Sequence, residues 1–295
     1  MESGYRWVVD IDLEKFFDRV QHDVLMSRLA RRIEDKGLLK LIRKLLQAGI
    51  MEGGLVSPRT EGTPQGSPLS PLLSNILLDE LDKELERRGH KFVRYADDAN
   101  IYVKSQQAGE RVLASIEEFL RERLKLTVNR DKSAVDHPWN RKFLGYTMTS
   151  DQKPKLLVSP AAKKRLLLRL KDTFRRGRGR RLQTTVDELA KMLPGWLRYF
   201  RYADVRSGFD KLDRWIRRRL RWILWRQWKG RKKRLKELNK RGVKPAMALK
   251  GVNNGRGPWW NSTQQHMNYA IKNREFQDMG LPSLLEEHKR LARSP

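Results

Sequence analysis

Four aspartates lie in pairs at the ends of two stretches that are typical of β-strands. Asp10 and Asp12 end the apolar run "RWVVDIDL" (6–13), and Asp97 and Asp98 lie at the predicted tip of the hairpin "KFVRYADDANIYVKS" (91–105). If the two strands are neighbours in one sheet, these carboxylates converge and repel one another, so a hard divalent cation is their expected partner. Such a cluster suits phosphoryl transfer. The alternative is a solvated turn with a structural role.

The elements that must position these residues form an α+β pattern. Helices are expected at about 22–33, 38–48 and 107–124, together with a helix that begins near Leu69 and stops at Gly89. A Gly/Pro/Ser-rich loop covers 49–66, and "KFLGYTM" (142–148) predicts another strand. Strands separated by helices, with an antiparallel hairpin between them, are typical of an α+β fold. From Pro160 onward the chain is mostly helical in pattern.

The net charge of +29 lies almost entirely in the second half of the chain. Residues 1–150 hold 25 basic and 23 acidic side chains, whereas residues 151–295 hold 39 and 12. This asymmetry indicates a nearly neutral catalytic or scaffolding part joined to a part that binds a polyanion. Charge that serves solubility alone would not need to lie on one side.

Composition excludes several classes of site. The chain has no cysteine, which rules out disulfides and Cys-ligated zinc, and its five histidines have no ligand spacing. No stretch approaches the roughly 20 apolar residues of a membrane span, and the N-terminus lacks the apolar core of a signal peptide. We therefore expect a soluble protein of the cytoplasm with no membrane partner.

The order of five motifs resembles the palm of reverse transcriptases, and its details are similar to the bacterial group II intron reverse transcriptase/maturase family. The motifs are "DIDLEKFFDRV", "TPQGSPLSPLLSNI", "YADD", "LKLTVNRDKS" and "KFLGY". The resemblance implies a right-hand polymerase palm over residues 1–150, a helical thumb and maturase domain over 151–240, and a basic helical extension over 241–295. It also implies an RNA-directed DNA polymerase that adds dNTPs to a DNA primer on an intron RNA template, and that assists splicing of that RNA. The resemblance is to those members of the family that lack an endonuclease domain.

The resemblance carries a metal site onto this sequence. Asp12 matches the first metal aspartate, with the Leu13 carbonyl as an additional ligand, and Asp97 and Asp98 match the aspartate pair. Two Mg²⁺ ions, with Mn²⁺ as a substitute, would activate a 3′-hydroxyl and stabilise the leaving pyrophosphate. Asp10 precedes the metal aspartate by two positions on the same strand face, and we interpret it as a supporting charge.

The resemblance also carries over residues that bind nucleotide and primer. Phe17 matches the aromatic residue that excludes a 2′-hydroxyl, Gln65 and Gly66 match the pair that positions nucleotide and template, and Lys132 lies where a basic residue approaches the triphosphate. The alternatives are a core aromatic for Phe17 and a solvated side chain for Lys132. The primer grip matches Phe143, Leu144, Gly145 and Tyr146.

The basic half carries a helical pattern over "DKLDRWIRRRLRWILWRQWKGRKKR" (210–234). Helical projection places an apolar arc toward the core and Arg217, Arg218 and Arg221 roughly opposite, free to contact RNA phosphates and bases. The tryptophans of this stretch are expected to be mainly structural. A membrane-surface helix is the other interpretation, but basic residues interrupt its apolar face.

The sequence begins almost on the catalytic strand, whereas family members carry a fingers region before it. A truncated gene, a start codon placed too far downstream and a separately encoded upstream piece stay open as explanations. Without cationic partners for the triphosphate, we expect weak or absent polymerase activity from this chain alone. The main alternative function is a non-catalytic RNA-binding splicing factor. A retron or defence-type enzyme is disfavoured by the maturase-like half.

Overall fold

The computed structural model describes residues 3–48, 50–52, 55–57, 60–63, 68–204 and 206–293. Its contacts divide the chain into two compact units, Met1–Pro154 and Lys155–Pro295. This division lies close to the boundary expected at residue 150. The further boundary at residue 240 stays a prediction.

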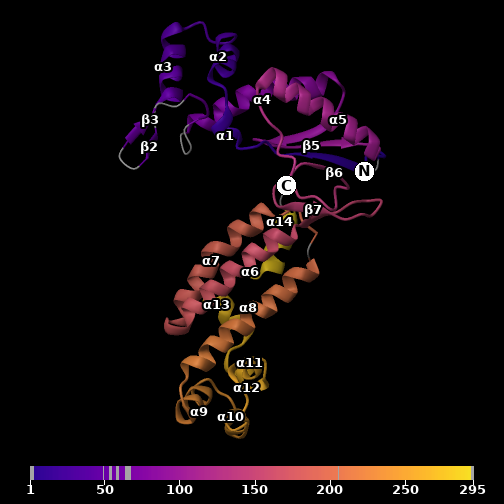
Figure 1. Cartoon of the computed structure of the whole chain (residues 1–295). Helices are drawn as coiled ribbons and strands as arrows, with labels where there is room; N and C mark the ends of the chain where they lie inside the picture. The colour runs from indigo at the N-terminus through magenta and orange to yellow at the C-terminus, as the bar shows by residue number, and fades with distance from the viewer. Residues whose placement is uncertain are drawn as a thin grey trace. The chain divides into compact units, whose positions relative to one another are not determined.

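The first unit is built on a four-stranded antiparallel sheet, drawn in Figure 1. Its order is β4 (Lys91–Tyr95), β5 (Asp98–Val103), β1 (Trp7–Ile11) and β6 (Ala134–Asp136). Asp10 pairs with Asn100, and Ile11 with Ala99. The prediction that the first strand and the hairpin are neighbours is therefore confirmed.

The two faces of this sheet differ in character because side chains alternate along each strand. Val9, Ile11 and Ile101 are fully buried on the face that packs against helices α4 (Leu69–Arg87) and α5 (Gln106–Phe119), which Figure 1 shows on one side of the sheet. The opposite face carries Asp10 and Asn100, and none of the described helices of the first unit lies over it in Figure 1. Asp10, Asp12 and Asp98 therefore belong to this second face, which is polar at these positions although Asp10 and Asn100 are themselves buried.

The first unit is completed by smaller elements: α1 (Phe16–Arg19), α2 (His22–Ala30), α3 (Lys36–Gln47), β2 (Ile50–Glu52), β3 (Leu55–Ser57), the π-helix η1 (Leu120–Leu124) and β7 (Tyr146–Met148). The strand predicted over 142–148 is wrong in its first half, where the chain makes a tight turn before β7. Strand β6 was not anticipated, because three residues are too few to show an alternating pattern.

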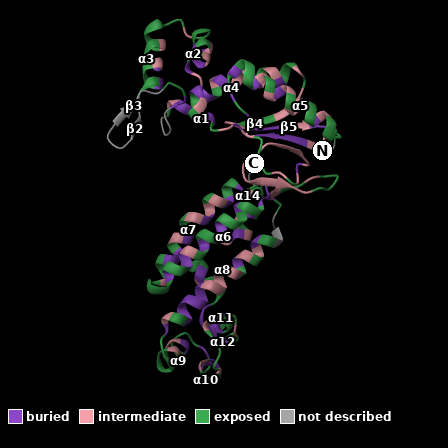
Figure 2. Cartoon of the chain, viewed as in Figure 1, coloured by how far each residue is buried: buried purple, intermediate pink, exposed green. Residues whose placement is uncertain are grey.

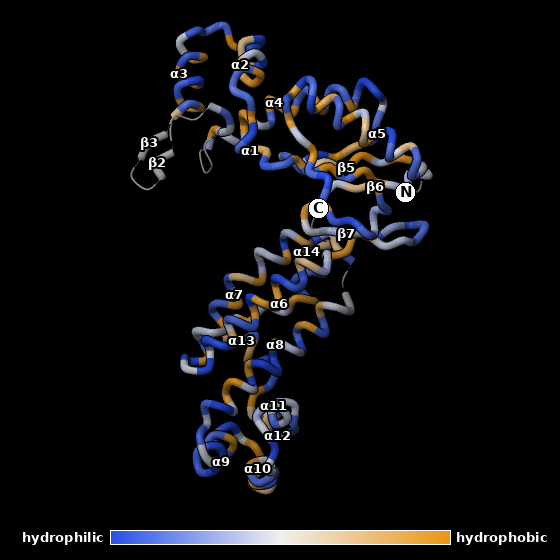
Figure 3. The backbone as a smooth tube through the Cα atoms, in the orientation of Figure 1, coloured by the Kyte–Doolittle hydropathy of each residue, from blue (hydrophilic) through white to orange (hydrophobic). Residues whose placement is uncertain are grey.

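The second unit is mostly helical, and its elements follow in chain order: β8 (Leu156–Val158), α6 (Pro160–Arg176), η2 (Gly177–Gly179), α7 (Leu182–Tyr199), α8 (Arg206–Gln227), α9 (Arg231–Lys240), α10 (Pro245–Val252), α11 (Pro258–Asn261), α12 (Gln265–Ala270), α13 (Asn273–Asp278) and α14 (Leu284–Arg293). Buried residues run along α6, α7 and α8 in Figure 2, and the same helices alternate hydrophobic and hydrophilic residues in Figure 3. None of the helices described is both long and apolar enough to cross a bilayer.

Two local contacts show why helices of the second unit begin where they do. Ser159 accepts a hydrogen bond from the Ala162 N–H at the start of α6, directly before Pro160. The buried carboxylate of Asp213 on α8 accepts the N–H groups of Leu284 and Leu285, the first residues of α14. An acidic side chain at a helix N-terminus satisfies amides that have no partner within the helix.

Candidate active site

Asp12 is held by its backbone at the end of β1. Its N–H donates to the Ser133 hydroxyl at 3.0 Å, and its carbonyl accepts the Asn129 N–H at 2.8 Å. The Lys132 ammonium lies 3.5 Å from a carboxylate oxygen of Asp12. Lys132 thus lies beside the candidate metal aspartate, and the turn that carries it is bonded to that aspartate's backbone.

The Leu13 carbonyl is directed away from the neighbouring strand. Leu13 lies opposite Val128, and the flanking hydrogen bonds run from the Glu14 N–H to the Thr127 carbonyl and from Asn129 to Asp12. In an antiparallel pair, a residue between two such bonds points its own N–H and C=O away from its partner. This orientation suits the ligand role that the resemblance implies for the Leu13 carbonyl.

Asp97 and Asp98 lie at the turn of the β4–β5 hairpin, as predicted. Ala96 starts the turn with a φ of 53°, Asp97 completes it, and Asp98 is the first residue of β5. Burial, together with the nearby negative charges of Asp10, Asp97 and Asp12, raises the pKa of Asp98 to about 6. The four carboxylates are therefore close enough for their charges to act on one another.

Asp10 has its own cationic partner. It is buried, and Arg141 approaches one of its carboxylate oxygens with Nε at 2.7 Å and Nη2 at 2.6 Å. The Asn100 side chain, oriented with its nitrogen toward Asp10, donates to the other oxygen at 3.1 Å. Burial raises the pKa of Asp10, and the hydrogen bond and charge of Arg141 oppose that rise. This arrangement fits a supporting charge better than a metal ligand.

The donor chemistry of the site fits a hard divalent cation. Within the described residues, no three Asp, Glu or His side chains are gathered closely enough to bind an ion alone. The oxygens available are those of Asp12, Asp97 and Asp98 and the Leu13 carbonyl. Mg²⁺ is commonly held by one or two carboxylates and completes its shell with water or phosphate oxygens.

The candidate sugar-contacting residue, Phe17, lies on α1. Its ring is half-buried and makes an edge contact with the buried ring of Phe16, with centroids 5.3 Å apart. The Phe17 carbonyl accepts the Thr63 N–H at 2.6 Å. The segment just before Gln65 is therefore tied to the residue expected to contact the sugar. Gln65 and Gly66 themselves lie outside the described residues.

Gly62 makes this contact close. It has a φ of +84°, and a β-carbon there would lie 2.8 Å from the Asp18 carbonyl oxygen. Its N–H donates to the Val20 carbonyl at 2.8 Å, and its own carbonyl lies 2.7 Å from a ring nitrogen of the buried His22. Sequence reasoning missed both Gly62 and His22. The first glycine of "GTPQG" was the available signal.

The candidate primer grip is a two-residue hairpin turn. Phe143 and Tyr146 exchange backbone hydrogen bonds of 3.0 and 2.9 Å. Leu144 and Gly145 between them have φ values of 51° and 78°, the combination of a type I′ turn. Leucine in this conformation costs on the order of 1–2 kcal/mol. The backbone therefore holds Leu144 at the hairpin tip under strain.

The arginines predicted to bind RNA have different environments. Arg221 is buried, donates to the Ile271 carbonyl at 3.0 and 2.9 Å and to Asn273 at 2.9 Å, and burial lowers its pKa to about 10. The prediction of a solvent-facing Arg221 is wrong, because the segment joining α12 and α13 covers that side of α8. Arg218 is half-buried with its guanidinium carbon 3.7 Å from the ring centroid of Trp259. Arg217 has the same intermediate exposure as Arg218 and forms no hydrogen bond or ion pair with the residues that the structure describes.

Two protein families match this chain over separate segments. The family "Reverse transcriptase (RNA-dependent DNA polymerase)" matches residues 1–148, and "Group II intron, maturase-specific domain" matches residues 163–242. Protein YkfC of Escherichia coli is 34% identical over 170 residues, covering 46% of this chain and 45% of that protein. The group II intron-encoded protein LtrA of Lactococcus lactis is 27% identical over 230 residues, covering 56% and 38%.

A solved structure extends the likeness to the fold. Telomerase from Candida albicans, in complex with a fragment of telomeric RNA, matches 97% of this chain and 46% of that chain with a TM-score of 0.51 and 15% identity. The chain spans less than half the length of the two curated relatives described above.

Proposed function

Since this chain belongs to the reverse transcriptase family and carries a group II intron maturase-specific domain, we propose that it is an RNA-directed DNA polymerase and intron maturase. Its substrates would be dNTPs, a DNA primer and an intron RNA that serves as template and splicing target. It would act in the bacterial cytosol as a ribonucleoprotein. The observation that carries the proposal is the antiparallel pairing of β1, which leads into Asp12, with β5, which begins at Asp98 beside Asp97 in the hairpin turn.

Enzymes of this family generally depend on a divalent metal. We assign the ligands to Asp12, Asp97, Asp98 and the Leu13 carbonyl, and the ions to two Mg²⁺. Bound there, the ions would supply activation of the 3′-hydroxyl and stabilisation of the pyrophosphate. Among the chain's own groups, Lys132 lies 3.5 Å from Asp12 and would offer a cation to an incoming triphosphate.

We assign the positioning of the nucleotide and the primer to residues that backbone hydrogen bonds hold around the site. The hydrogen bond from Thr63 to the Phe17 carbonyl ties Phe17 to the segment that leads into Gln65 and Gly66. Phe17 would exclude a 2′-hydroxyl by its bulk. The turn at Leu144 and Gly145 would hold the primer end, because a two-residue hairpin tip is a rigid support.

The test is primer extension on an RNA template with Mg²⁺. The double variant Asp97→Ala/Asp98→Ala should abolish extension, whereas Glu118→Ala, an exposed acid on α5, should leave it unchanged. Extension that survives in the double variant would overturn the polymerase assignment. A longer version that includes upstream sequence is measured beside the 295-residue chain, because the triphosphate needs cationic partners.

The second candidate is a non-catalytic RNA-binding splicing factor. The observation that favours it is the match of residues 163–242 to the group II intron maturase-specific domain, a segment that contains none of the candidate metal aspartates. Absence of extension by every version, combined with tight binding of intron RNA, would support this candidate.

A further inference from the structure

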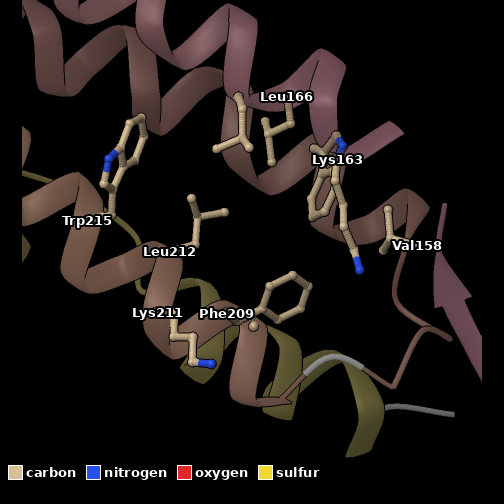
Figure 4. Close-up of a pocket in the computed structure, with 10 residues that line it drawn as sticks. Val158, Lys163, Leu166, Phe209, Lys211, Leu212 and Trp215 are labelled. Carbon is tan, nitrogen blue, oxygen red and sulfur yellow. The ribbon is translucent and has the colours of Figure 1, made fainter. Parts of the chain in front are cut away.

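An apolar pocket of about 340 Å³ lies between α6 and α8 in the second unit. Figure 4 shows it in close-up, with side chains from both helices facing the space. Its volume falls within the range of sites that bind small organic groups, roughly 300–1,000 Å³. It is a separate site from the aspartates of the first unit.

Aromatic rings form a large part of the pocket wall. Trp196, Phe209 and Trp215 line it. Trp196 makes an edge contact with Phe209 at 5.9 Å, and Trp215 makes one with Phe174 at 5.4 Å, both measured between ring centroids. Each tryptophan of the wall therefore packs edge-on against a neighbouring phenylalanine ring, a favourable aromatic geometry.

Two lysines from the facing helices complete the lining. Lys163 comes from α6 and Lys211 from α8, and Figure 4 shows both ammonium groups beside the space. Both residues are exposed, and neither forms an ion pair within the residues described, whereas nearby Lys155 pairs with Asp204 at 2.9 Å. The free cations call for an anionic group on the ligand.

We propose that this pocket binds the base of an unpaired nucleotide of the bound RNA, with phosphates beside that base held by Lys163 and Lys211. A base presents a flat π-face to the aromatic wall, and the strand itself supplies the anions. The wall offers almost no polar side-chain atoms to read base edges, so binding is tolerant of sequence. An apolar peptide would leave both lysines without a partner. The inference rests on the proposed RNA binding by the second unit.

Gly208 offers a way to fill the pocket without removing any core side chain. It lines the pocket on α8, and a β-carbon there would meet no atom within 4 Å. Gly208→Leu therefore places a side chain in the space, and glycine is a poor helix former, so the fold should be retained. Gly195→Leu is the matched control, because Gly195 is an exposed helical glycine outside the lining with equal space for a β-carbon.

The experiment compares the affinity of the full chain for oligouridylate and for an abasic strand of equal length. We expect the wild type and Gly195→Leu to bind oligouridylate about ten-fold more tightly than the abasic strand, because stacking of one base contributes roughly 1–3 kcal/mol. Gly208→Leu should bind both strands equally. Leu167→Glu, which adds a carboxylate to the same lining, should act in the same direction, and thermal unfolding checks that each variant is folded.

The outcomes separate the inference from the function on which it rests. If the wild type binds neither strand, the proposed RNA binding itself is overturned. If it binds both strands equally, or if Gly208→Leu keeps the preference, RNA binding stands and the pocket assignment is overturned.

Discussion

The guanidinium of Arg141 lies 2.6 Å from a carboxylate oxygen of Asp10, a residue on the first strand of the sheet and 131 positions away in sequence. Asp10 is 8% exposed, so its charge depends on this partner. Arg141 lies just before the candidate primer-grip turn. Its contact with Asp10 therefore holds this turn near the strand that leads to Asp12.

Removal of Arg141 should therefore destabilise the first unit. Arg141→Gln removes the cation that is hydrogen-bonded to this buried carboxylate, and we expect the free energy of unfolding to fall by about 3 kcal/mol. Urea denaturation measures the change. Arg130→Gln is the control, because Arg130 pairs with Glu117 at the surface, where such pairs contribute about 0–1 kcal/mol. Equal losses in the two variants would contradict the prediction.

The stability of the metal-free protein should depend on pH through Asp98. The pKa of Asp98 is about 6 in the folded state against an ordinary value of 3.8, so between these values the folded state binds more protons than the unfolded state. Stability therefore falls as pH rises through this window, and Asp98→Asn removes that loss. After allowance for solvent screening, the variant should gain about 1–2 kcal/mol over wild type between pH 4 and pH 7. The free energy of unfolding of both proteins is measured against pH in a buffer that contains a chelator. The same pH dependence in wild type and Asp98→Asn would contradict the prediction.

Substitution of Leu144 in the strained turn should raise stability and lower activity. Leu144→Gly relieves a φ of 51° and should stabilise the first unit by about 1 kcal/mol. If the side chain holds primer, the same variant should extend primer more slowly. Lys125→Gly serves as the control, because Lys125 has a φ of 56° at the end of η1, away from the primer-grip turn, and should gain stability without loss of extension. Unchanged extension by Leu144→Gly would remove the side chain from the primer site.

Gly62 should tolerate no other residue. Gly62→Ala combines a positive φ with a β-carbon 2.8 Å from a backbone oxygen, so we expect a loss of about 3 kcal/mol or more. Gly89→Ala has a φ of +71° and open space, so it should lose only about 1–2 kcal/mol. In extension assays, Gly62→Ala should also weaken discrimination between dNTPs and rNTPs, because Phe17 is bonded to the displaced segment. Similar stability losses at the two glycines would show that the backbone contact is unimportant.

Substitution of Arg217 and substitution of Arg221, both on α8, should have opposite effects on RNA binding and stability. Arg217→Gln should lower the salt dependence of RNA binding by about one phosphate contact with little effect on stability. Arg221→Gln should instead lower the free energy of unfolding by about 2–3 kcal/mol, since it removes buried hydrogen bonds to Ile271 and Asn273. Salt titrations and thermal unfolding of the same two variants distinguish these effects. If Arg221→Gln instead changed the salt dependence of RNA binding strongly, Arg221 would have to contact RNA.

Local patterns were sufficient to predict the strand of Asp10 and Asp12 and the hairpin of Asp97 and Asp98, because residue alternation and turn chemistry act within a few positions. Patterns could not show the environment of Arg221. Helical projection describes one helix and assumes solvent opposite its apolar arc, whereas Ile271 and Asn273 come from a segment about fifty positions away. The contacts of Lys132 with Asp12 and of Gly62 with Asp18 could not be predicted either, because these residues are also far apart in sequence.

The packing of Gly62 has a genetic consequence. The atoms that leave no room for a side chain there belong to the main chain of Phe17 and Asp18, which every amino acid shares. No change of side chain at either neighbour can create space, so a lesion at Gly62 should have no suppressor among the residues it touches. A selection for restored activity should yield reversion to glycine.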